Sequence, residues 1–198
     1  LRTVHHRTGL HAAGQRVFGE NRAQELAAKY HALPKDIEWH MIGHLQTNKI
    51  KYIAPFVSLI HSIDSPKLLE EVNRQAAKVN RTIPCLLQVH IAEEESKFGF
   101  SANEIIGLMT SPAWNSLGNI LVKGLMGMAT FTQDERQVRR EFRALSTLFE
   151  RLRTDSLPPQ VSMEELSMGM SGDYMVALEE GSTMIRVGTG IFGERLHK

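Results

Sequence analysis

The sequence predicts an α/β protein of the (β/α)8 TIM barrel class. Seven apolar segments have the pattern of β-strands, centred near Val17, Trp39, Ile60, Leu87, Val122, Ser167 and Ile185. All but the last precede a helical stretch, and strands that alternate with helices indicate parallel βα units. Seven strands suit an open doubly wound sheet poorly and are one short of a closed barrel, so we expect the first strand to lie upstream of Leu1.

Size and charge indicate one domain that binds neither nucleic acid nor a membrane. The 198 residues fit a single barrel, and we expect one domain over residues 1–198 that is incomplete at its N-terminus. The 23 basic and 22 acidic residues give no electrostatic footprint for a polyanion. No apolar run approaches the roughly 18 residues of a membrane span. Cys85 is the only cysteine, which excludes a disulfide framework and favours the cytoplasm.

The first half of the chain supplies four strand and helix units. The first strand ends at Gly19-Glu-Asn21, which places Asn21 on the loop face, and residues 23–31 continue as a helix. A second strand over 38–43 leads into a loop that begins at Gly43-His44. The third strand ends at Asp64-Ser65-Pro66, a helix N-cap followed by a proline, and the fourth strand covers residues 85–92.

The second half repeats the same alternation. Ser101-Ala-Asn-Glu104 is a capping box that opens a helix, and a strand follows over 120–128. Thr132-Gln-Asp-Glu135 is expected to cap a long helix that ends at Leu152. The last units are a strand over 165–170, a helix over 173–180 and a strand over 184–191.

Two clusters of residues contain possible metal ligands, but neither has the pattern of a metal site. His5, His6 and His11 have no acidic or cysteine partner at ligand spacing, so we expect a solvated segment there. Three consecutive glutamates begin at Glu93, but neighbouring side chains point in different directions and are usually solvated.

The last two strands end in small residues that suit a phosphate. Segments 166–173 and 183–193 carry five glycines together with Ser167, Ser171 and Thr189, so backbone N–H groups and hydroxyls are available to an anion. Glycine is also the ordinary residue of tight turns, and two structural turns remain the alternative. In (β/α)8 barrels, however, phosphate is often held by the loops after the last two strands.

Six motifs resemble the pyridoxal phosphate homeostasis protein family, the single-domain relatives of the alanine racemase N-terminal barrel. They occur in the same order over essentially the whole chain: Phe18-Gly-Glu-Asn21, Trp39-His-Met-Ile-Gly-His-Leu-Gln-Thr-Asn-Lys49, Lys97-Phe-Gly-Phe100, Gly124-Leu-Met126, Leu166-Ser-Met-Gly-Met-Ser-Gly-Asp173 and Arg186-Val-Gly-Thr-Gly-Ile-Phe-Gly193. The resemblance implies a barrel of the alanine racemase N-terminal type. It also implies binding of pyridoxal 5′-phosphate (PLP) and a role in intracellular vitamin B6 and amino/keto-acid balance.

The resemblance also implies which residues contact the cofactor. The phosphate cradle would be formed by Ser167, Met168, Gly169, Gly188 and Thr189. Arg186 resembles the arginine that faces the pyridine nitrogen, where a permanent cation disfavours a protonated ring and weakens its capacity as an electron sink. Asn21 is similar to the family asparagine near the ring hydroxyl. His44, Asn48 and Met128 would line the same face, although loop packing is an equal alternative for His44 and Asn48.

One family feature is missing from the sequence. The family holds PLP as a Schiff base on a lysine in a Val-Ser-Lys segment shortly before the counterpart of Gly14-Gln-Arg16, and no such segment is present. We expect this lysine upstream of Leu1 rather than lost, since a barrel without a strand would expose two sheet edges. Lys49, Lys97 and Lys123 are not expected to replace it.

The main alternative function is an amino-acid racemase. Racemisation needs two acid–base groups on opposite faces of the substrate, and the tyrosines Tyr30, Tyr52 and Tyr174 fall on expected helices or their starts. We therefore expect a cytoplasmic, monomeric PLP carrier with no fast reaction of its own, with PLP-dependent apoenzymes as candidate partners. A barrel that binds a phosphosugar without PLP is the third alternative.

Overall fold

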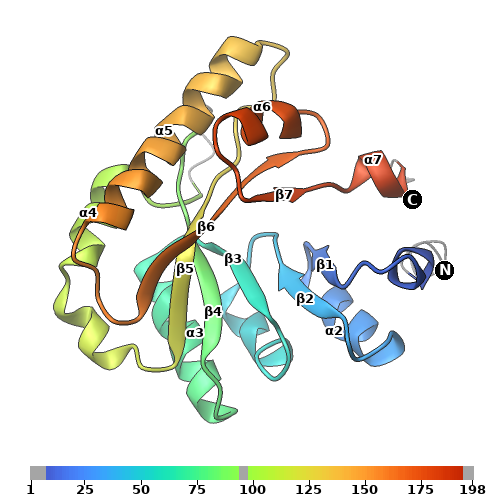
Figure 1. The fold of residues 1–198 in the computed structure, drawn as a ribbon. Helices are drawn as coiled ribbons and strands as arrows, with labels where there is room; N and C mark the ends of the chain where they lie inside the picture. The colour runs from blue at the N-terminus through green and yellow to red at the C-terminus, as the bar shows by residue number, and fades with distance from the viewer. Residues whose placement is uncertain (1–7, 94–97, 194–198) are drawn as a thin grey trace.

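The seven predicted strands form one parallel sheet. The structure, a computed structural model, describes residues 8–93 and 98–193. Within them the strands are hydrogen-bonded in chain order and curl into a nearly closed barrel, with β1 and β7 on either side of the opening (Figure 1). The strands are β1 Val17–Glu20, β2 Glu38–Met41, β3 Leu59–Ile63, β4 Ile83–Gln88, β5 Ile120–Met126, β6 Val161–Met170 and β7 Met184–Arg186.

Helices cover the outside of this sheet (Figure 1). Residues 8–12 are helical and precede β1. The remaining helices are α2 Ala23–Ala32, α3 Pro66–Lys78, α4 Ala102–Met109, α5 Glu135–Thr154, α6 Tyr174–Glu179 and α7 Thr189–Phe192, with 3-10 turns η1 Thr47–Tyr52 and η2 Pro112–Ser116. None of the helices in the described part of the chain combines the length and the hydrophobicity that a membrane span requires.

Side-chain caps fix where three of these helices begin. The Ser65 hydroxyl accepts a hydrogen bond from the Leu68 N–H, and Ser101 forms the predicted capping box with Glu104. The segment Thr132-Gln-Asp-Glu135 caps α5 as predicted, with Asp134 as the N-cap, and the helix continues past Leu152 to Thr154. The Thr132 hydroxyl accepts from the Asp134 N–H and so orients the capping residue.

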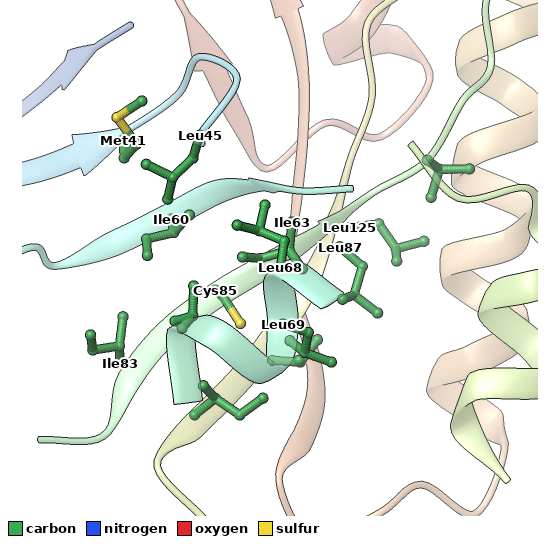
Figure 2. Packing of buried hydrophobic residues seen from close by; sticks show 14 of the residues in the cluster. Met41, Leu45, Ile60, Ile63, Leu68, Leu69, Ile83, Cys85, Leu87 and Leu125 are labelled. Carbon is green, nitrogen blue, oxygen red and sulfur yellow. The ribbon is translucent and has the colours of Figure 1, made fainter. Parts of the chain in front are cut away.

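The main core lies between the sheet and the helices. In Figure 2, Leu68 and Leu69 of α3 face Ile63 and Leu87 of the sheet, and these side chains are almost completely buried. Burial of such a side chain contributes about 2 kcal/mol to folding. Cys85 belongs to the same cluster, and burial raises the pKa of its thiol to about 12, so it packs as a small neutral side chain.

The predictions for the last two strands have different outcomes. Strand β6 ends at Met170, as predicted, and begins earlier than predicted, at Val161. Strand β7 stops at Arg186, and a helical turn replaces the strand expected to reach Ile191. Gly188 and Gly190 interrupt the β-branched residues that follow Arg186, and glycine disfavours strands. The N–H groups of these two glycines bond to Ser171, which follows β6, instead of to a neighbouring strand.

Candidate binding site

A large cavity is lined by both edge strands of the barrel. Its volume is about 2450 Å³, and residues of β1, β2, β3 and β7 line it together with the segments that follow β5 and β6 and with residues of α2. Five of the predicted site residues are among those that line it, namely Asn21, Met128, Arg186, Gly188 and Thr189. The structure therefore brings together residues that are far apart in the sequence.

The segments after β6 and β7 meet at Ser171. The Ser171 hydroxyl oxygen accepts hydrogen bonds from the backbone N–H of Gly188, at 3.2 Å, and from that of Gly190, at 3.3 Å. Two backbone N–H groups thus converge on one oxygen atom beside the cavity. A phosphate oxygen satisfies the same donors, and the Ser171 hydroxyl can itself donate to it. The donor set fits a phosphate group.

Arg186 places a positive charge inside the barrel at the end of β7. Its Nη1 donates to the Ser167 carbonyl oxygen at 2.9 Å and to the Ser167 hydroxyl at 2.6 Å, and its Nη2 donates to the Gly127 carbonyl oxygen at 3.0 Å. These acceptors are neutral, so these hydrogen bonds do not neutralise the charge. Burial lowers the pKa of Arg186 to about 10, which the charge of Asp173 partly opposes, and the side chain stays a cation at neutral pH.

Two buried histidines continue this chain of hydrogen bonds across the barrel. The Nδ1 atom of His61 on β3 lies 3.0 Å from the Ser167 hydroxyl, and its Nε2 lies 3.0 Å from Nδ1 of His40 on β2. Both imidazoles line the cavity. Burial lowers the pKa of His40 to about 4 and that of His61 well below its ordinary value, and the charges of His40 and Arg186 add to the shift of His61. Both rings are neutral near pH 7.

The remaining predicted site residues lie outside the described cavity lining. The half-exposed His44 pairs with Asp64 at 3.1 Å and packs on Phe98, with ring centroids 4.8 Å apart. Asn48 is exposed on η1. Met168 is completely buried in the core between the sheet and the helices.

Two more predicted site residues, Ser167 and Gly169, also lie outside the cavity lining. Ser167 is fully buried and contacts the cavity through Arg186 and His61. Gly169 has a φ of +93°, and a Cβ atom there would lie 2.5 Å from Cβ of Ala177. The close approach of β6 to α6 therefore requires glycine at this position.

Sequence reasoning noticed Ser171 without assigning it to the site, and it missed His61. The signal for Ser171 is its position as the first residue after β6, which places its hydroxyl at the loop face. The signal for His61 is a polar residue inside the strand Leu59-Ile-His-Ser-Ile63, whose residues are all buried. A buried polar side chain needs a partner, and here the partners come from strands distant in sequence.

Both described lysines that line the cavity are already paired with carboxylates. Lys29 forms an ion pair with Glu20, and Lys123 pairs with Glu164 at 3.0 Å. Lys49 lies on η1, and the expectation for Lys97 falls outside the described residues.

Metal binding has no support in residues 8–93 and 98–193. No group of three metal-ligating side chains is found there, and His11 pairs with Asp36 at 2.9 Å. The other two histidines of the N-terminal cluster and the second and third residues of the glutamate run fall outside the described residues.

Comparisons with known proteins identify the family and agree with this fold. The sequence profile of the alanine racemase N-terminal domain matches residues 3–196. A pyridoxal phosphate homeostasis protein of Aquifex aeolicus is 42% identical over 183 residues, which cover 92% of this chain and 78% of the relative. The solved structure of PipY of Synechococcus elongatus with PLP bound is 34% identical, with a TM-score of 0.82, and the match covers 96% of this chain and 87% of that one. Alanine racemase of Bartonella henselae, at 16% identity and a TM-score of 0.66 over 96% of this chain and 52% of its own, shares the fold.

Proposed function

The chain belongs to the pyridoxal phosphate homeostasis protein family, which has the fold of the alanine racemase N-terminal domain, and on that premise we propose that it binds PLP and takes part in PLP homeostasis. One observation carries the proposal. The Gly188 and Gly190 N–H groups converge beside the same cavity into which Arg186 projects. A phosphate site and a cation for an aromatic nitrogen are therefore available to a single ligand.

The residues present can each take a distinct part of the cofactor. Ser171 and the Gly188 and Gly190 N–H groups would hold the phosphate, with Thr189 beside them on the cavity lining. Arg186 would donate to the pyridine nitrogen, and Asn21 and Met128 would flank the ring. When bound, PLP supplies an aldehyde that reacts with amines and a ring that withdraws electrons. Because Arg186 holds its proton, it keeps the ring nitrogen unprotonated and limits that withdrawal.

We infer that the protein carries PLP without a fast reaction of its own. Racemisation would need a second acid–base group opposite the cofactor lysine. None of the tyrosines, Tyr30, Tyr52 and Tyr174, is among the described residues that line the cavity. Tyr30 instead stacks on Phe56, with ring centroids 3.9 Å apart. A monomer that delivers PLP to apoenzymes is the form of this role that we favour.

Calorimetric titration with three ligands tests the proposal. PLP is expected to bind, inorganic phosphate to compete with it, and pyridoxal, which lacks the phosphate, to bind at least about tenfold more weakly because it loses the charge-assisted hydrogen bonds. Absence of PLP binding would exclude the proposed function. Borohydride reduction followed by peptide mass spectrometry would identify the attached lysine.

A separate assay decides between carrier and racemase. The PLP-loaded protein is incubated with L-alanine, and D-alanine is quantified by chiral chromatography. We expect only trace conversion, whereas sustained turnover would assign the protein to the racemases. Size-exclusion chromatography with light scattering checks the expectation of a monomer.

A further inference from the structure

We propose that His40 and His61 are positioning residues for Arg186, and that they act through Ser167 to fix the guanidinium that binds the pyridine ring. This inference rests on the proposed function for the identity of the ligand. The geometry that carries it is independent of the ligand. Four side chains from β2, β3, β6 and β7 form one continuous chain of hydrogen bonds, from His40 through His61 and Ser167 to Arg186.

The direction of each hydrogen bond follows from the arginine. A guanidinium can only donate, so the Ser167 hydroxyl oxygen accepts from Arg186 Nη1. The Ser167 proton is then available to His61 Nδ1, the other polar atom near it, at 3.0 Å. The opposite order, with a proton on His61 Nδ1, would direct the proton of the fully buried Ser167 away from both neighbours.

The tautomer and protonation state of both imidazoles follow from the same hydrogen-bond directions. Because His61 Nδ1 accepts, the proton of the neutral ring lies on Nε2, which donates to His40 Nδ1 at 3.0 Å. His40 in turn is neutral with its own proton on Nε2. An added proton on His61 would place a cation in a buried chain that already ends at Arg186, so the chain is stable only with both rings neutral.

This chain limits the positions available to Arg186. The Ser167 hydroxyl and carbonyl hold Nη1 from one side, and the Gly127 carbonyl holds Nη2. The carbonyl oxygens are fixed by the strands, but the Ser167 hydroxyl can rotate about its Cα–Cβ bond. His61 removes that freedom, and His40 fixes His61. A guanidinium held in this way loses less conformational freedom when it binds the ring.

A matched pair of substitutions at His61 separates the two ends of its ring. In His61→Asn the side-chain amide takes approximately the position of Nδ1, so the contact with Ser167 is kept. In His61→Gln the amide reaches the position of Nε2, so the contact with His40 is kept and that with Ser167 is lost. Thermal unfolding and circular dichroism establish that both variants fold.

The ligands then distinguish a positioning role from a structural one. We expect the affinity for PLP to fall about tenfold in His61→Gln and to stay within about threefold of wild type in His61→Asn, as for loss of one hydrogen bond at a charged group. The affinity for inorganic phosphate, which needs only the Ser171 region, should stay unchanged in both. An unchanged PLP affinity in His61→Gln, or an equal loss of PLP and phosphate affinity in both variants, would overturn the positioning role.

Nitrogen-15 NMR of the histidine rings in the ligand-free protein tests the hydrogen-bond chain without PLP. At pH 7 we expect His61 to show a bare Nδ1 and a protonated Nε2, with signals assigned from the two variants. The reverse tautomer would refute the chain. Failure of the wild type to bind PLP would instead remove the proposed function, so the two failures give different results.

Discussion

The hydroxyl oxygen of Ser171 lies 3.2 Å from the backbone nitrogen of Gly188, across the gap between the ends of β6 and β7. This contact joins two segments that follow separate strands and arranges the N–H groups of Gly188 and Gly190 toward one point. Neither segment alone supplies a complete anion site. The phosphate half of the site thus depends on the pairing of the last two strands.

Removal of that hydroxyl is expected to weaken phosphate binding. Ser171→Ala deletes one donor to the phosphate and removes the contact that directs the Gly188 and Gly190 N–H groups toward one point. We expect PLP and inorganic phosphate each to bind about tenfold more weakly, measured by calorimetry. Thr147→Ala, which removes an exposed hydroxyl on α5, is the control and should bind as wild type does. Full affinity in Ser171→Ala would place the phosphate elsewhere.

Gly169 is expected to be required for packing. In Gly169→Ala the new Cβ would lie 2.5 Å from the Ala177 Cβ at a φ of +93°, so both the strain and the contact oppose it. We expect the free energy of unfolding to fall by about 2 to 4 kcal/mol in urea denaturation.

Substitution of a second glycine, Gly107, is expected to change the unfolding free energy in the opposite direction and serves as the control. Gly107 is exposed on α4, and no atom lies within 4 Å of the place that a Cβ would take. Gly107→Ala should therefore stabilise the protein by about 0.5 to 1 kcal/mol. Similar changes for both substitutions would contradict the packing role of Gly169.

The strands could be predicted because each carries a local pattern. The apolar run at Cys85-Leu-Leu and the capping box at Ser101 each depend on a few neighbouring residues, and both predictions are confirmed. The prediction of a strand from Met184 to Ile191 was wrong after Arg186. There the backbone conformation depends on hydrogen bonds to Ser171, which no local pattern reveals.

The candidate site could be predicted only in part for the same reason. Arg186 is the last residue of β7 and Gly188 lies just after it, and the resemblance to the family already implied both as site residues. The hydrogen bond between His61 and Ser167 joins residues 106 positions apart, and only the register of the barrel brings them together. The cofactor contacts of the predicted residues stay predictions for the experiments above.

Glu180 is expected to hold α6 against α5. The Arg143 guanidinium donates to both Glu180 oxygens, at 3.0 and 2.9 Å, and Arg139 donates to Glu180 at 3.1 Å. These bonds, that of Arg143 first, keep the pKa of Glu180 below its ordinary value, so the carboxylate is ionised at neutral pH. In Glu180→Gln the charge is lost, and we expect faster amide hydrogen exchange in α6 and in the Ser171 segment before it.

Hydrogen exchange with mass spectrometry measures this effect by segment. Glu150→Gln is the matched control, because Glu150 forms an ion pair with Arg153 inside α5. This ion pair does not join α5 to α6. Exchange in α6 should stay at the wild-type rate in this control. Equal rates in Glu180→Gln and wild type would show that apolar contacts alone hold α6.

Acid is expected to destabilise the protein through His40 before its carboxylates are protonated. The folded-state pKa of His40 is about 4 and its ordinary value is 6.5, so between these pH values the unfolded chain binds a proton that the folded protein excludes. Stability is therefore complete above pH 6.5 and is lost as the pH falls toward 4, by about 3 kcal/mol from His40 alone. His61, which faces His40 and Arg186, acts in the same direction.

In His40→Gln the slope of unfolding free energy against pH should fall by about one proton, or roughly 1.4 kcal/mol per pH unit, near pH 5. Urea denaturation at pH 5, 6 and 7 measures the slope, with Thr147→Ala as control, and parallel curves for wild type and His40→Gln would show that His40 is protonated in the folded protein.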